Sequence, residues 1–105
     1  MLEENTPNAD PQGDPVVGYD FGRALSNLKN GKKVCRRGWN GKGMWIIMAP
    51  GSTVDVAPGS PYEKAGLGVV EINPHIDMKT ATGEMQPGWL ASQTDMLAED
   101  WESVE

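Results

Sequence analysis

The feature that most constrains the fold is the run RRGWNGKGMW at residues 36–45, which places Asn40-Gly41 between two strand-like segments. Asn-Gly in this position is the strongest short-range sequence signal for a β-hairpin, because both residues tolerate the positive φ angles of a tight turn. The run therefore predicts strands over residues 32–39 and 44–49, joined by a turn over residues 40–43.

The remaining pattern predicts two helices and several more strands. Asp20 is a helix cap, apolar residues follow it at helical spacing, and Gly31 ends the helix. Ser92 and Asp95 have the spacing of a capping box, which predicts a short helix over residues 94–98. We expect strands over residues 68–72, 75–80, 84–86 and 100–104, and a loop over residues 50–68 with one short turn at 61–65.

These elements predict an α+β fold, in which a small antiparallel sheet carries an N-terminal amphipathic helix and a short C-terminal helix. Residues 1–17 contain three prolines, four acids and no basic residue, so we expect a disordered acidic tail ahead of one domain over residues 18–105. The tail lacks the basic and apolar parts of a signal peptide, and no apolar run reaches the ~18 residues of a membrane span. We therefore expect a soluble, cytosolic protein that has no membrane partner.

Charge is distributed unevenly along the chain, although the formal net charge is −6. Residues 21–54 hold seven basic side chains and no acid, whereas residues 71–105 hold eight acids against Lys79 alone. This asymmetry predicts pairing between the two halves, or head-to-tail pairing between subunits. An acidic protein also repels a long phosphate chain beyond a small pocket, which disfavours binding to long nucleic acid.

The core is expected to be thin, because the chain has one phenylalanine and two tyrosines. A domain of this size buries only about 60% of its unfolded surface. We therefore expect a homo-oligomer, in which association adds buried area and forms pockets between subunits.

The hairpin run also has the composition of a phosphate and base site. Arg36, Arg37 and Lys42 offer charged donors to phosphate, Trp39 offers a stacking face, Asn40 offers an amide, and the glycines permit close backbone approach. Strand alternation places only one of the two arginines toward a given site. The structural alternative, in which tryptophans beside a hairpin turn cap a small core, stays open at this point.

A second candidate surface is the polar run Ser92, Gln93, Thr94 and Asp95. Free backbone amides at a helix start, together with hydroxyl, amide and carboxylate groups, suit base edges, ribose hydroxyls or phosphate. The alternative is a capping box that only begins a helix.

Catalytic and metal-binding groups are scarce. His75 is the only histidine and Cys35 the only cysteine, which excludes an intrachain disulfide and any metal centre built on several histidines or cysteines. A magnesium site at Asp95, Glu99 and Asp100 competes with the commoner interpretation of a solvated acidic face. The residues predict a binding protein with no catalytic residues, no metal and no cofactor.

Three long motifs, at residues 21–45, 75–85 and 87–102, closely resemble the phage-encoded Thoeris anti-defence family in its nucleotide-sponge branch. The similarity covers almost the whole domain, from Asp20 to Val104. The resemblance implies a homotetramer in the cytoplasm of the infected bacterium that sequesters cyclic ADP-ribose isomers, such as glyco-cyclic ADP-ribose, without cleaving them. It extends in some relatives to the cyclic dinucleotides and oligonucleotides of CBASS defence.

Carried onto this chain, the resemblance makes Trp39 the base-stacking ring, with Asn40 and Lys42 near polar or phosphate groups and Arg36 or Arg37 neutralising phosphate. Ser92 to Asp95 would recognise polar edges, and Met78, Lys79 and Thr80 would form a wall. Trp45, Trp89 and Trp101 are expected in the core or a subunit interface. Two alternatives are an enzyme that degrades the same nucleotide and a protein-interaction module that inhibits an effector directly.

Overall fold

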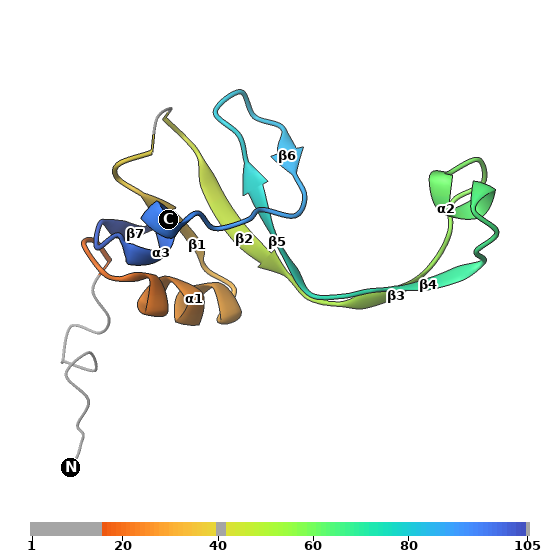
Figure 1. Cartoon of the computed structure of the whole chain (residues 1–105), viewed down its shortest axis with the longest axis horizontal. Helices are drawn as coiled ribbons and strands as arrows, with labels where there is room; N and C mark the ends of the chain where they lie inside the picture. The colour runs from red at the N-terminus through yellow and green to blue at the C-terminus, as the bar shows by residue number, and fades with distance from the viewer. Residues whose placement is uncertain (1–15, 40–41, 105) are drawn as a thin grey trace, which may run out of the picture.

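The protein has an α+β fold, seen in a computed structural model that describes residues 16–39 and 42–104. A five-stranded antiparallel sheet, in the order β6-β5-β2-β1-β7, forms the body, and β3 and β4 form a separate two-stranded ribbon (Figure 1). The expected N-terminal helix and short C-terminal helix are both present. The elements are α1 (Phe21–Lys29), β1 (Lys33–Arg36), β2 (Trp45–Ala49), β3 (Ser52–Asp55), α2 (Pro61–Lys64), β4 (Val69–Ile72), β5 (His75–Lys79), β6 (Met85–Gln86), α3 (Gln93–Leu97) and β7 (Trp101–Val104).

The core lies between α1 and one face of the sheet. Asp20 caps α1 by accepting a hydrogen bond from the backbone N–H of Arg23 at 2.9 Å, as its sequence position predicts. The buried face of the helix contacts β1, β2 and β7. The fully or almost fully buried apolar side chains are those of Tyr19, Ala24, Leu28, Val34, Ile46 and Trp101.

The strand predicted over residues 32–39 is shorter than expected and ends at Arg36. The N–H of Arg37 donates to the carbonyl of Asp100, and the N–H of Trp39 turns back to the carbonyl of Arg36. The N–H of Gly38 donates to Asp100 Oδ2 at 2.8 Å. A Cβ atom at Gly38 would lie 2.8 Å from that oxygen, so this glycine permits the approach of the chain's own carboxylate. Asn40 and Gly41 lie outside the described residues, and the turn type stays a prediction.

The predicted loop over residues 50–68 is wrong in one respect, because Ser52–Asp55 forms β3 and pairs in register with β4. Together with α2, these strands form an arm that extends away from the body (Figure 1). Every β3 residue is exposed. Because neither face of the strand is buried, its sequence lacks the alternation of apolar and polar residues by which a strand is predicted. The longest dimension of the molecule, 53 Å, reflects this arm.

The N-terminal boundary is described from Val16 onward. The Val16 carbonyl accepts a hydrogen bond from the N–H of Ser103 at 2.8 Å, and Tyr19 forms a bridge with Trp101. Residues 1–15 lie outside the described residues, so the division into a disordered tail over residues 1–17 and a domain over residues 18–105 stays a prediction.

Candidate ligand-binding site

Asp95 joins the two segments that the sequence singled out for binding. Its Oδ1 atom accepts hydrogen bonds from Trp39 Nε1 and from Arg36 Nη1, each at 3.0 Å. Its Oδ2 atom accepts from the N–H of Ser92 at 3.1 Å, and Ser92 Oγ accepts from the N–H of Asp95 at 3.0 Å, which completes the predicted capping box. The turn after β1 and the start of α3 therefore lie against each other, although 56 positions separate Trp39 from Asp95.

Arg36 lies between two carboxylates at this site. Besides Asp95, its Nε atom donates to Asp100 Oδ1 at 2.8 Å. The bond from Arg36 holds the pKa of Asp100 below its ordinary value. Burial opposes ionisation of Asp95, but the hydrogen bonds from Trp39, Ser92 and Arg36 outweigh it and lower its pKa. Both carboxylates are thus ionised at neutral pH, and the Arg36 charge is already neutralised within the chain.

Trp39 is half-buried and belongs to an aromatic cluster. Its ring lies edge-on to Trp101, with the centroids 5.4 Å apart, and to Trp89, with the centroids 6.1 Å apart. Trp101 is fully buried and its Nε1 atom donates to the Asp95 carbonyl at 3.0 Å. The ring therefore packs against the core, as the structural alternative expects, while the base-stacking role of Trp39 stays a prediction.

The other predicted residues of this site differ in whether they are exposed or already paired with another side chain of the protein. Gln93 and Thr94 are exposed in the first turn of α3, and Lys42 is exposed within the hairpin turn. Arg37 is bound to Glu102, with Nε and Oε2 2.8 Å apart. Asn40 lies outside the described residues.

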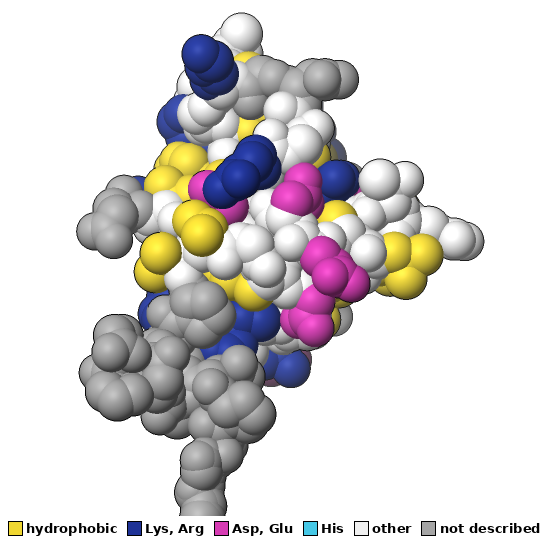
Figure 2. All heavy atoms as spheres, turned by 90° about the vertical axis from the view of Figure 1, so that its left-hand side faces the viewer, with side chains coloured by type: hydrophobic (Ala, Val, Ile, Leu, Met, Phe, Trp, Pro, Cys, Tyr) yellow, Lys and Arg dark blue, Asp and Glu magenta, His cyan; other side chains and the backbone are white. Residues whose placement is uncertain are grey.

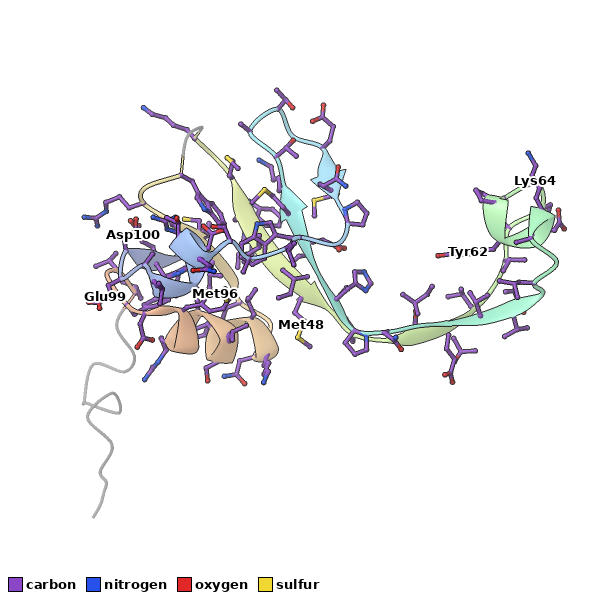
Figure 3. The ribbon with its side chains drawn as sticks, in the orientation of Figure 1. Met48, Tyr62, Lys64, Met96, Glu99 and Asp100 are labelled. Atoms are coloured by element: carbon purple, nitrogen blue, oxygen red, sulfur yellow. The ribbon has the colours of Figure 1, made fainter. Side chains whose placement is uncertain are left out.

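Pairing between the basic and acidic halves of the chain occurs within the monomer. The two arginines of the hairpin contact Asp95, Asp100 and Glu102 of the C-terminal segment. Figure 2 shows the end of the body that carries α3 and β7, where acidic and basic side chains lie among hydrophobic ones. Figure 3 labels Met96, Glu99 and Asp100 on this end, far from Tyr62 and Lys64 on the arm.

Met78, Lys79 and Thr80, the predicted wall, lie on or directly after β5. Met78 packs against the core, whereas Thr80 bonds to Glu84 Oε1 at 2.8 Å within the turn before β6. Lys79 Nζ donates to the Gly43 carbonyl at 3.0 Å and lies 5.9 Å from the centroid of the Trp45 ring. No described contact joins this group to the Asp95 site.

Trp45 is not part of the main aromatic cluster, so of its two expected places, the core or a subunit interface, only the interface stays a prediction. The ring is half-buried, and the ammonium of Lys33 lies over it at 5.2 Å from the centroid. Sequence reasoning assigned Trp45 no ligand role, because the two lysines that meet at its ring come from different strands. Only strand order, which is a tertiary property, places β1 and β5 on either side of β2.

The single cysteine and the single histidine both lie on strands of the five-stranded sheet. Cys35 is half-buried on β1, and burial, followed by the charges of Glu102 and Asp100, raises the pKa of its thiol. His75 lies at the junction between the arm and the body, where its Nδ1 atom is 2.8 Å from the Asn73 carbonyl. Its Nε2 atom lies 3.5 Å from Asp77 Oδ2.

A hollow of about 580 Å³ opens at the start of α1, away from the residues predicted to bind ligand. Its described lining includes Asp20, Arg23 and Glu99 and none of the predicted ligand-binding residues. Across the described residues, no group of three or more His, Cys, Asp or Glu side chains is arranged to hold a metal ion.

Residues 19–104 match the Thoeris anti-defense 2-like domain. The chain belongs to this family. It is also similar to Thoeris anti-defense 2 of Bacillus phage SP01, with 39% identity over 88 residues that cover 80% of this chain and 92% of the relative. The family match therefore includes both the hairpin with Trp39 and the α3 segment with Asp95.

Membership of the Thoeris anti-defense 2-like family supports a phage anti-defence role, and the family is named for that role and not for an enzymatic activity. Within the described ranges, no helix has the length and apolar character needed to cross a membrane.

Proposed function

We propose that this protein is a sponge for cyclic nucleotide immune signals. It binds cyclic ADP-ribose isomers such as glyco-cyclic ADP-ribose, and also CBASS cyclic dinucleotides and oligonucleotides, and withholds them from their effectors in the host cytoplasm. The observation that carries this proposal is the pair of hydrogen bonds from Trp39 and Arg36 to Asp95, which unites the two segments predicted to bind nucleotide. Membership of an anti-defence family supports the same role.

The contacts separate the residues that hold the site in place from those that are exposed to a ligand. Arg36 and Asp95 satisfy each other and hold Trp39 and the first turn of α3 in place. Gln93 and Thr94 remain exposed on that turn, where their amide and hydroxyl groups are free to meet ribose hydroxyls or base edges. The exposed part of Trp39 supplies an apolar surface beside them. In this proposal, Arg36 positions the site and does not bind phosphate.

The proposed sponge is a homotetramer with pockets shared between subunits. An isolated two-stranded ribbon is marginally stable in water, yet the arm exposes Val54 by 38% and Val69 by 60%. Leu90 and Leu97, which flank and end α3, are exposed by 89% and 78%. Burial of these side chains against further copies stabilises the assembly by about 25 cal/mol for each Å² of apolar area. Light scattering tests this proposal, and a monomeric mass at micromolar concentration refutes it.

Ligand depletion tests the function directly. Protein is mixed with a cyclic ADP-ribose isomer in the presence of a chelator, and free ligand is measured by mass spectrometry before and after heat unfolding. A sponge removes ligand in proportion to protein, stops at saturation and returns it with unchanged mass. Substoichiometric protein that consumes excess ligand indicates an enzyme. Inhibition of a purified effector without any nucleotide indicates a protein-interaction module.

Two variants locate the site. Removing a hydrogen-bonding side chain costs about 0.5–1.5 kcal/mol, so Gln93→Ala and Thr94→Ala should each weaken binding by about 2- to 12-fold in calorimetry. Ser26→Ala is the matched control, because Ser26 is exposed on α1 and lines the hollow whose described lining has none of the predicted ligand-binding residues. Equal affinities for all three variants and the wild type would place the ligand elsewhere.

A further inference from the structure

The sheet has one face that none of the described helices of the body covers. Val34 and Ile46 are paired neighbours and point into the core beneath α1. Arg36 lies on the same side as Val34, and it holds α3 through Asp95. Both body helices therefore lie on one side of the sheet, while α2 lies on the arm (Figure 1). Lys33, Cys35, Trp45 and Lys79 project from the opposite side, which we term the open face.

Three side chains of the open face form a cationic cluster around one indole. Trp45 lies on the middle strand of three, and its backbone pairs with that of Lys79 on β5. The ammonium groups of Lys33 and Lys79 lie 5.2 and 5.9 Å from the centroid of the ring. Both distances are within cation–π range, so the ring holds two positive charges near each other on a half-buried surface.

No carboxylate among the described residues lies within ion-pair distance of either lysine. The acids that share the open face are engaged elsewhere, since Glu102 binds Arg37 and Asp77 accepts from the N–H of Gly88. This differs from the helix-bearing face, where Asp95 and Asp100 neutralise Arg36. The open face thus keeps two positive charges on a protein whose net charge is −6.

We propose that the Lys33–Trp45–Lys79 cluster is a separate binding site for nucleoside diphosphates. Two ammonium groups complement two phosphates, and the Trp45 edge with neighbouring Ile47 provides an apolar surface for the base. The site differs from the Asp95 site in its chemistry, because charge and not polar-edge recognition dominates it. Binding here should therefore weaken as the salt concentration rises.

Calorimetric titration with ADP and adenosine, at 50 and 300 mM salt, tests the site. The wild type should bind ADP in a salt-dependent manner and adenosine at least tenfold more weakly. The double variant K33Q/K79Q should lose at least tenfold in ADP affinity. The double variant K29Q/K32Q removes the same charge from exposed lysines at the end of α1, and it should stay within twofold of the wild type.

NMR of the wild-type protein tests the site even if the lysine variant fails to fold, and the Trp45→Phe variant assigns the Trp45 indole resonance. ADP should shift the indole N–H resonance that is absent from the Trp45→Phe spectrum, and it should leave the Trp39 indole unmoved. Absence of ADP binding to the wild type, equal losses in the two lysine pairs, or a shift at Trp39 alone would each overturn the proposal. A cyclic ADP-ribose titration of Trp45→Phe reports separately on the sponge function, because Trp45 is not among the residues predicted to bind the cyclic nucleotide.

Discussion

Replacing Asp95 with asparagine isolates the group that joins the hairpin turn to α3. The residue is 8% exposed, and its two carboxylate oxygens accept three hydrogen bonds. Asparagine keeps the shape but has one acceptor oxygen and an NH₂ group. If its oxygen faces Trp39 and Arg36, its NH₂ faces the N–H of Ser92; if the amide is turned, its NH₂ faces both other donors.

The magnitude follows from the interactions that are lost. Loss of the charge on the partner of Arg36 removes a charge-assisted bond of about 1.5–3 kcal/mol, and loss of the bond to Ser92 removes about 0.5–1.5 kcal/mol. Arg36 keeps Asp100, which limits the cost of leaving its charge unpaired. We therefore expect Asp95→Asn to lower the free energy of unfolding by about 2–4 kcal/mol. For a domain of this size, the melting temperature should fall by roughly 8–30 °C.

Urea unfolding at pH 7, followed by tryptophan fluorescence, measures the change. Glu99→Gln is the matched control, because it removes the same charge from an exposed side chain on the same segment. The control should stay within about 0.5 kcal/mol of the wild type. If Asp95→Asn is no more destabilising than Glu99→Gln at an unchanged m-value, Asp95 does not hold the two segments together and our account of the site is wrong.

Three further outcomes follow from the same contacts. Because the folded-state pKa values of Asp95 and Asp100 lie below the ordinary value of about 3.9, their contribution to stability is present above pH 4 and lost as the pH falls through the folded values. The urea midpoint should decline below pH 4, and a flat midpoint down to pH 3 would contradict this. Trp101→Ala should cost about 3–5 kcal/mol in thermal unfolding, because the ring is fully buried; a loss under 1 kcal/mol would remove it from the core. Burial raises the pKa of the Cys35 thiol, so iodoacetamide at pH 8 should modify it more slowly in folded than in urea-unfolded protein, and equal rates would refute the assignment.

The sequence by itself determined the features that depend on neighbours in the chain. The cap at Asp20 and the capping box of Ser92 and Asp95 each join positions three apart, so residue identity and spacing were enough to predict them. The apolar spacing of α1 likewise predicted its buried face, and the class of fold followed from the order of the elements. These interactions are local, and their geometry hardly changes with tertiary context.

Tertiary structure decided everything that depends on distant partners. Asp100 ends β1 and neutralises Arg36 from 64 positions away, and no local pattern identifies such a partner. The same fold paired Arg36, a predicted phosphate-binding residue, with two carboxylates of the chain itself, and it gave Trp39 a place in the aromatic cluster. It also paired β3 with β4, although neither face of β3 is buried, and brought Lys33 and Lys79 to Trp45 through strand order alone. The sequence determines which residue types are available for a site. Strand pairing determines which charged side chains are neutralised by other residues and which are left without an acidic partner.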